Sequence, residues 1–168
     1  MSLNNTTARD FSMRSAGAED IALILQFIRE LAEYERLSHM VSATEHGLRE
    51  ALFGKHRGTE VVLAFEDTTA VGFAVYFNNF STFLGVRGLW LEDLFVRPEF
   101  RGRGYGKALL LNVAGIAHAR GCGRFEWAVL DRNEPSINFY KSLGAQPLDD
   151  WTIYRVTGPA LQRLAALS

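Results

Sequence analysis

The sequence has few of the features that mark secreted, membrane-spanning or nucleic-acid-binding proteins. Its single cysteine, Cys122, cannot form an intramolecular disulfide, and nothing indicates export. The segment Met1–Arg9 is polar and lacks the apolar core of a signal peptide. The most apolar helical stretch, residues 108–117, is too short to span a bilayer. A formal net charge of -1 provides no global positive field for nucleic acid or anionic membrane. We therefore expect a cytoplasmic, soluble protein that binds neither.

The chain length and composition suit one globular domain. It has 168 residues, of which 48% are hydrophobic and 22% charged, both ordinary values for a soluble domain. No repeat, low-complexity tract or Pro/Gly-rich linker divides it. We expect a single domain over residues 1–168, with residues 1–9 forming a loose N-terminus.

Hydrophobic periodicity and turn residues predict a mixed α/β architecture. The predicted order is β-α-α-β-β-β-α-β-α-β, with a polar and aromatic loop at residues 78–86. The strands are expected at residues 11–15, 60–65, 70–77, 88–96, 124–130 and 151–156, and the helices at 21–32, 44–52, 105–120 and 135–143.

The segment from Leu91 to Gly106 is the most informative part of the sequence. A strand leads into Arg101-Gly102-Arg103-Gly104-Tyr105-Gly106, which opens a helix. Alternating glycines allow successive backbone N–H groups to turn towards one point, and the helix start adds positive potential. Arg101 and Arg103 can pair with phosphate oxygens. The spacing differs from both the dinucleotide fingerprint and the Walker loop, so we predict another kind of pyrophosphate site.

This motif resembles the acetyl-coenzyme A motif of the GNAT superfamily, and the predicted element order is that of the GNAT fold. Three further segments, ELAEYE (30–35), LEDLFV (91–96) and NEPSINFYK (133–141), resemble the diamine acetyltransferases that act on spermidine/spermine or thialysine. The similarity runs from Met13 onward. It implies a mixed, mostly antiparallel sheet flanked by helices, and an acetyl-CoA-dependent N-acetyltransferase of small primary amines. It also implies a homodimer.

The resemblance also implies a set of coenzyme-binding residues. The third long strand would offer its backbone to the pantetheine arm and acetyl carbonyl, the glycine loop would hold the pyrophosphate, and a later helix would line the coenzyme near its sulfur. In chain order these residues are Leu94, Phe95, Val96, Arg101, Gly102, Arg103, Gly104, Tyr105, Gly106, Lys107, Asn133, Ser136 and Tyr140.

Acetyl transfer to an amine requires the loss of a proton from the amine and benefits from a proton donated to the departing thiolate. The family assigns the second role to the tyrosine that matches Tyr140, which could otherwise simply pack beside Phe139. Glu92 interrupts an apolar strand and is the candidate base, acting directly or through water. Alternatively, Glu92 or its neighbour Asp93 could form a salt bridge, with Arg87 or Arg124 as the partner.

Further acidic and aromatic residues are candidates for binding the amine. Tyr34 and Glu35 end the first helix, where the family's matching residues border the amine pocket, and Asp93 and Asp150 add negative charge. If these acids converge, the pocket selects cationic amines. The diamine enzymes carry an Asp-Pro-Trp element where this chain has Ser81-Thr82-Phe83, which leaves shorter diamines and amino-acid side chains open as acceptors.

Other chemistries have weaker support in the sequence. Cys122 lies between two glycines in a turn, so we expect direct transfer in a ternary complex rather than a thioester intermediate. The four histidines lack metal-ligand spacing, and we expect no metal. The alternatives are a protein N-terminal or lysine acetyltransferase, which needs a wide groove, and an acyl-CoA-sensing module without turnover.

Overall fold

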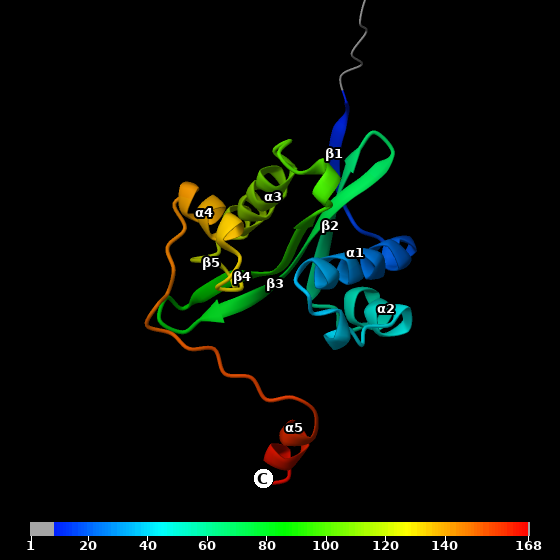
Figure 1. Cartoon of the computed structure of the whole chain (residues 1–168). Coiled ribbons are helices and arrows are strands. Elements are labelled where there is room, and N and C mark those ends of the chain that lie inside the picture. Colours follow the sequence, from blue (N-terminus) through cyan, green and yellow to red (C-terminus); the bar gives the residue numbers. More distant parts are fainter. Residues whose placement is uncertain (1–8, 168) are drawn as a thin grey trace, which may run out of the picture. The chain divides into compact units, whose positions relative to one another are not determined.

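The computed structural model describes residues 9–167, in two compact units that divide after Ala128. Most of the loose N-terminus expected at residues 1–9 lies outside the described residues. The first unit is built on a five-stranded sheet with the order β1-β2-β3-β4-β5 (Figure 1). Its strands are β1 (Phe11–Ser15), β2 (Thr59–Glu66), β3 (Thr69–Ser81), β4 (Val86–Val96) and β5 (Phe125–Trp127).

Helices cover both faces of this sheet. On one face lie α1 (Ile21–Tyr34) and α2 (Glu45–Phe53), whose apolar residues join the core cluster of β2, β3 and β4. On the other lies α3 (Tyr105–Ala119), which contacts the same three strands (Figure 1). Short 3-10 turns at Ala18–Asp20, Ser38–Met40 and Pro98–Phe100 complete the unit.

The predicted α/β class and the mostly antiparallel sheet are confirmed. The first four strands pair antiparallel in sequence order, and β5 pairs parallel with β4. The α3 helix has to lie between β4 and β5 in the chain, because parallel neighbours need a crossover connection. This connection places the glycine–arginine loop at the end of β4.

An aromatic cluster forms the centre of the core beneath α1. Phe27 is fully buried, stacks on Phe73 at 5.2 Å and meets Phe95 edge-on at 6.3 Å. The guanidinium of Arg97 lies 4.8 Å from the Phe27 ring centre. Its Nε and Nη2 each donate to Glu30 at 2.8 Å. A cation–π contact and an ion pair thus tie the end of β4 to α1.

The predicted loop at residues 78–86 is wrong in its bounds. Pairing of β3 with β4 continues from Asn78↔Leu89 to Ser81↔Val86, which leaves a short turn. Asn78 and Asn79 favour a loop by composition, but the ladder is formed by backbone groups, which a favourable partner strand can engage whatever the side chains are.

The second unit, residues 129–167, contains α4 (Glu134–Ser142) and α5 (Gly158–Ala165). The predicted strand at 124–130 shortens to β5, and the predicted strand at 151–156 is not formed. A strand requires a neighbour for its backbone groups, and no described strand pairs with these residues. Trp151 and Ile153 are 72% and 70% exposed. We did not predict α5, although Pro159 at its first turn is a helix-start signal.

Replacing Phe27 tests the aromatic core. We expect Phe27→Ala to lower the free energy of unfolding by roughly 3–5 kcal/mol, because it leaves a cavity and removes two ring contacts. Phe83, which is 93% exposed, supplies the control, and Phe83→Ala should change stability by less than about 0.5 kcal/mol. Urea denaturation of both variants measures the difference. Similar losses in the two would contradict a core centred on Phe27.

Candidate active site

A β-bulge lies in the middle of β4. Asp93 is opposite Val75, and Leu91 is opposite Tyr76, so Glu92 between them has no partner on β3. The extra residue keeps Trp90 and Asp93 on the same sheet face although they are three positions apart, because each extra residue reverses the alternation. Bulges of this kind often re-aim side chains beside active sites.

The bulge brings acidic groups together on the face covered by α1. Asp93 is half-buried, and burial together with the negative charges of Glu92 and Glu35 raises its pKa to about 6. Glu35 is the C-cap residue of α1, so α1 and β4 both contribute. A carboxyl with a pKa near neutrality can accept a proton at pH 7 and release it again.

Glu92 has a different environment. Its side chain is exposed, and its Oε2 accepts a hydrogen bond from Trp90 Nε1 at 2.8 Å. The indole N–H holds this carboxylate in a fixed orientation. Among the described residues, neither Glu92 nor Asp93 forms a salt bridge with Arg87 or Arg124, and Arg124 pairs instead with Glu126 at 2.8 Å.

Beyond the bulge, no strand within residues 9–167 pairs with the edge of β4 that faces away from β3. The pairing of β4 with β5 covers only Leu89–Leu91. Arg97 N–H donates to Val71 O on β3, so by strand alternation Leu94 and Val96 direct their backbone groups away from β3. Phe95 directs its backbone to β3 and its buried ring to the core. Of the three predicted pantetheine contacts, only Leu94 and Val96 therefore have backbone groups on the open edge.

The glycine loop after β4 leaves a row of backbone donors free. Gly102 and Gly104 have φ values of 77° and 85°, which favour glycine, and an added Cβ at either would meet no heavy atom within 4 Å. Within residues 9–167, no hydrogen bond uses the N–H groups of Gly102–Lys107, and the first in the helix is Ala108 N–H to Gly104 O. These donors and the helix start suit an anion.

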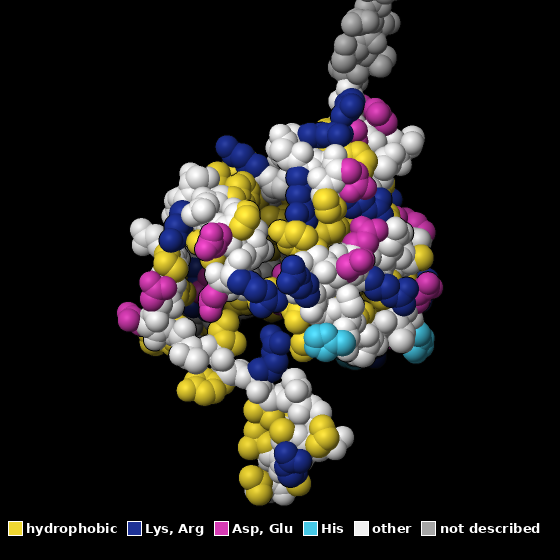
Figure 2. Space-filling model, in the orientation of Figure 1, with side chains coloured by type: hydrophobic (Ala, Val, Ile, Leu, Met, Phe, Trp, Pro, Cys, Tyr) yellow, Lys and Arg dark blue, Asp and Glu magenta, His cyan; other side chains and the backbone are white. Residues whose placement is uncertain are grey.

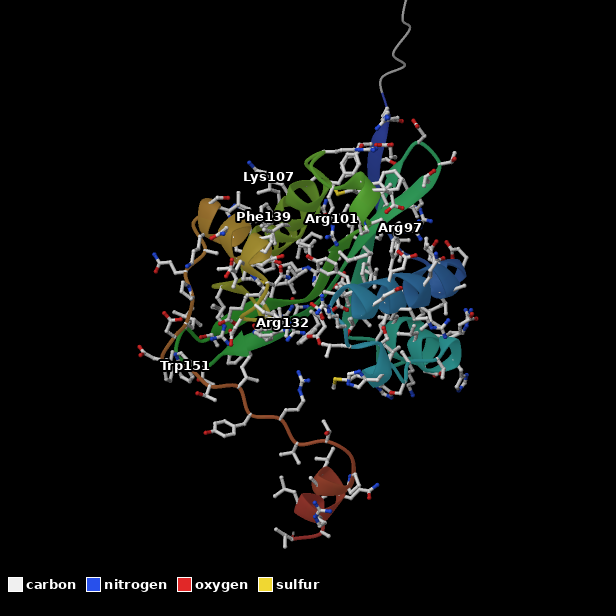
Figure 3. The ribbon with its side chains drawn as sticks, viewed as in Figure 1. Arg97, Arg101, Lys107, Arg132, Phe139 and Trp151 are labelled. Carbon is white, nitrogen blue, oxygen red and sulfur yellow. The ribbon has the colours of Figure 1, made fainter. Side chains whose placement is uncertain are left out.

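The arginines of this segment have different partners. Arg101 Nε donates to Val96 O at 2.9 Å, and its guanidinium lies 4.1 Å from the centre of the Tyr34 ring. Arg103 instead pairs with Glu66, its Nη1 lying 2.6 Å from Oε2. Figure 3 labels Arg97 and Arg101 on the connection from β4 to α3, and Lys107 in the first turn of α3. Tyr34, predicted at the amine, thus contacts the loop arginine.

The remaining predicted residues lie in the second unit. Asn133 is the N-cap of α4, and its Oδ1 accepts from Ser136 N–H at 3.4 Å. Tyr140 is half-buried, with its ring 5.3 Å from that of Phe139. Asp150 lies in an exposed turn. The helix cap explains why Asn133 and Pro135 begin α4 here, and the coenzyme roles of these residues stay predictions.

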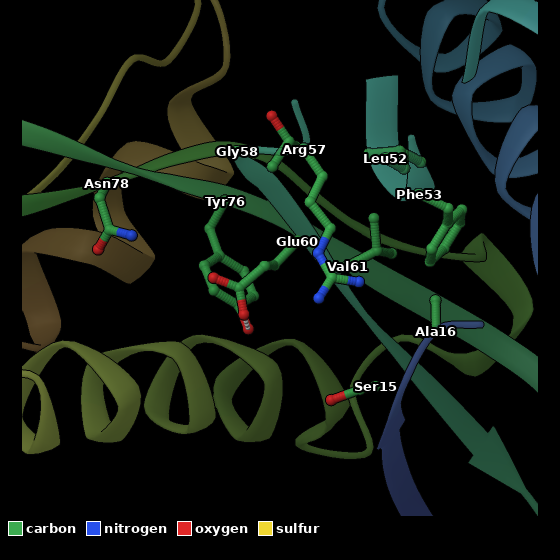
Figure 4. Close-up of a pocket in the computed structure, with 11 residues that line it drawn as sticks. Ser15, Ala16, Leu52, Phe53, Arg57, Gly58, Glu60, Val61, Tyr76 and Asn78 are labelled. Carbon is green, nitrogen blue, oxygen red and sulfur yellow. Dashed lines mark hydrogen bonds between the residues drawn. The ribbon is translucent and has the colours of Figure 1, made fainter. Parts of the chain in front are cut away.

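A separate pocket of about 440 Å³ opens at the start of β2 (Figure 4). Leu52, Phe53 and Val61 form an apolar wall. Glu60 pairs with Arg120 at 2.7 Å and accepts from the Tyr76 hydroxyl at 3.4 Å. The start of β2 lies beside Phe77 of β3, which pairs with Trp90 of β4. The glycine loop instead follows Val96, at the other end of the sheet, so this pocket is not part of the loop site.

Residues 9–167 contain neither a membrane-spanning helix nor a cluster of metal-binding side chains. Among them, no helix is long and apolar enough to cross a membrane. No group of three or more His, Cys, Asp or Glu side chains there could hold a metal ion. Basic and acidic side chains are interspersed over the face in Figure 2.

Comparison with known proteins identifies the family of this chain. Residues 24–145 match the acetyltransferase (GNAT) family. The chain belongs to this family of enzymes. GNAT acetyltransferases use acetyl-CoA, and the predicted fold, enzyme class and family resemblance are confirmed.

The similar proteins include characterised N-acetyltransferases. Thialysine N-epsilon-acetyltransferase of Mus musculus is 38% identical to this chain, and the match covers 91% of this chain and 96% of the length of the mouse protein. L-ornithine N5-acetyltransferase of Arabidopsis thaliana is 32% identical over 97% of this chain and 92% of its own. Among solved structures, an integron cassette protein from the mobile metagenome of V. cholerae has a TM-score of 0.78 and 28% identity, covering 92% of this chain and 97% of its own.

Two residues that hold other side chains of this site in place have no role predicted from the sequence. Trp90 orients Glu92, and Glu66 holds Arg103. The available signal for Glu66 was an acid ending an otherwise apolar strand. Nothing in the local sequence indicated a role for Trp90, because a tryptophan in an apolar strand is normally expected to pack in the core.

The raised pKa of Asp93 predicts a pH-dependent effect on stability. Since its folded pKa exceeds its unfolded value, the folded state binds more protons between about pH 4 and 6, and stability is lost as pH rises through that range. The rise from 3.8 to about 6 corresponds to about 3 kcal/mol.

Asp93→Asn should therefore gain stability over the wild type as the pH increases from about 4.5 to 7.5. Denaturant titrations at both pH values measure this change, with exposed Asp131→Asn as the control. A difference between Asp93→Asn and wild type that did not depend on pH would contradict the raised pKa.

Proposed function

We propose that the protein transfers the acetyl group of acetyl-CoA directly to a small, cationic primary amine. The observation that carries this proposal is Asp93, a half-buried carboxyl of raised pKa beside the open edge of β4. The edge suits a ligand with amide groups, and the acid suits an amine that must lose a proton. The two requirements of the reaction meet on one strand.

The described residues fit the coenzyme. Free N–H groups over Gly102–Lys107 would hold the pyrophosphate, with the helix start supplying positive potential. The backbone groups of Leu94 and the N–H of Val96 would pair with the amides of the pantetheine arm as a neighbouring strand does. Bound acetyl-CoA supplies an activated acetyl group as a thioester. Arg101, whose Nε is held by Val96 O, has its remaining guanidinium donors available for phosphate.

The acidic cluster would handle the proton of the amine. An amine of pKa near roughly 10.4 is protonated at neutral pH, so a nearby base is needed before attack. Asp93 is better suited to accept that proton than Glu92, the residue favoured from sequence. Glu92, oriented by Trp90, raises the pKa of Asp93 and attracts the cationic substrate. Glu35 adds a third negative charge, and Asp150 is proposed as a fourth.

The second unit supplies the proposed acid. By the resemblance to diamine acetyltransferases, Tyr140 donates a proton to the departing thiolate, and Asn133 and Ser136 line the coenzyme near its sulfur. The cap bond between Asn133 and Ser136 supports a fixed start of α4. If the start of α4 at Glu134 is fixed, the Tyr140 ring, six positions further along the helix, is held in a defined direction.

The relatives narrow the proposed acceptor. Enzymes named for thialysine and ornithine act on amines at the end of amino-acid side chains. The tip of the β3–β4 hairpin here, Ser81-Thr82-Phe83, carries no acid, which favours these shorter amines over long polyamines. The alternative is a protein lysine acetyltransferase. As the resemblance implies, we also propose a homodimer.

An amine panel with acetyl-CoA tests the proposed function. We expect turnover with diamines and thialysine-like amino acids, and kcat/KM that rises with pH through about 6. Asp93→Asn should abolish this rising limb. Glu92→Gln should move it to lower pH, because removing a neighbouring negative charge lowers the pKa of Asp93. If no amine were turned over, the proposed acetyltransferase activity would be refuted. If the rising pH limb were unchanged in Asp93→Asn, the role of Asp93 as the base would be refuted.

Tyr140→Phe tests the proposed acid. It should lower kcat by about a hundredfold with little change in the KM of the amine, since the proton is needed only as the thiolate develops. The loss should shrink with an acetyl donor whose thiol is more acidic. Phe139→Leu is the control for packing and should retain most of the activity. Wild-type kcat in Tyr140→Phe would leave the ring with a packing role only.

A further inference from the structure

A buried carboxylate connects the end of β2 to the coenzyme loop. The side chain of Glu66, the last residue of β2, is 9% exposed. Arg103 Nη1 donates to its Oε1 at 2.7 Å and to its Oε2 at 2.6 Å. The Tyr105 hydroxyl also donates to Oε2. Arg9 lies further away, with its Nη1 3.7 Å from Oε1.

The two main partners of Glu66 flank the turn that starts α3. Arg103 precedes and Tyr105 follows Gly104, the left-handed residue at the N-cap. Both are held a second time. The Tyr105 ring stacks on Phe11 at 4.3 Å, and Arg103 Nη2 donates to Glu99 O at 3.1 Å. One carboxylate thus fixes the chain on both sides of the helix start.

We propose that Glu66 is a positioning residue for the coenzyme loop, which rests on the proposed function. A loop with two positive-φ glycines has many conformations in isolation, and ordering it on binding would weaken affinity. The contacts of Glu66 order it in advance. The free N–H groups of Gly102–Lys107 would then need little further ordering when the pyrophosphate binds.

This assignment changes the expected role of Arg103. The sequence predicts Arg103 to be a phosphate ligand. In the structure, the charge of Arg103 is neutralised by Glu66. The two roles predict opposite effects of removing the carboxylate charge. If Arg103 only braces the loop, loss of Glu66 weakens binding. If Arg103 can reach phosphate, loss of Glu66 frees a cation and strengthens binding.

The chain contains a matched control for this test. Glu60 projects from the same face of β2 and pairs with Arg120 through both oxygens, at 2.7 and 2.8 Å. It also accepts from a tyrosine, Tyr76 (Figure 4). The cluster has the same chemistry as that of Glu66 but lies at the opposite end of β2. Glu60→Gln therefore controls for the loss of an arginine–carboxylate pair in general.

Calorimetry with coenzyme A on the full chain tests the proposal. We expect Glu66→Gln and Arg103→Ala each to raise the Kd of coenzyme A about tenfold. The double variant should have a Kd no higher than that of either single variant, because both substitutions remove the same Arg103–Glu66 interaction. Glu60→Gln should leave the Kd within about twofold, and the KM of the amine at saturating acetyl-CoA should not change in Glu66→Gln. If Glu66→Gln melts below the assay temperature, Arg103→Lys, which keeps the carboxylate and its charge partner, should give an intermediate Kd.

The outcomes are distinguishable. Tighter binding by Glu66→Gln would overturn the proposal and make Arg103 a phosphate ligand. An unchanged Kd in Glu66→Gln, or equal changes in Glu66→Gln and Glu60→Gln, would overturn it as well. If wild-type protein did not bind coenzyme A, the proposed function itself would fail, and the positioning role with it.

Discussion

The incomplete pairing of β4 is the constraint on which the rest of the site depends. A central strand normally satisfies backbone groups on both edges. Here β3 satisfies one edge, while β5 covers the other only over Leu89–Leu91. The backbone groups of Leu94 and the N–H of Val96 are directed away from β3, and we propose that they pair with a ligand, whereas Val96 O accepts from Arg101 Nε. Because the loop to α3 begins directly after this edge, the same strand would, in the proposed function, connect the reactive end of acetyl-CoA to its phosphates.

Acidic neighbours decide what each arginine near this strand can do. Arg97 is neutralised by Glu30, and Arg103 by Glu66. Arg101 contacts a backbone oxygen and the face of Tyr34, which leaves its charge uncompensated by those contacts. Three identical side chains in one short segment therefore have different electrostatic roles. The positive potential towards a ligand comes from Arg101 and the free N–H groups rather than from the number of arginines.

The sequence predicted what depends on local pattern. The alternating apolar residues of β2 and β3 and the glycine loop before α3 lie where expected, because side-chain period and backbone preference act over neighbouring residues. Features that depend on distant residues were missed. Residues 151–156 have a strand pattern, but pattern does not supply a partner strand. The bulge at Glu92 arises from register with β3, and it places Asp93, which we propose as the base, on the face covered by α1.

The coupling among the acids gives the proposed site a direct response to its substrate. Glu92 and Glu35 raise the pKa of Asp93, so near pH 6 part of the free protein holds a proton there. A cationic amine placed among these groups offsets their repulsion and lowers that pKa. Binding then favours the carboxylate, the form able to accept the proton of the amine. The negative charges of Glu92 and Glu35 would thus attract the cationic amine, and their neutralisation by the bound amine would leave Asp93 deprotonated. An isolated carboxylate could not respond to the substrate in this way.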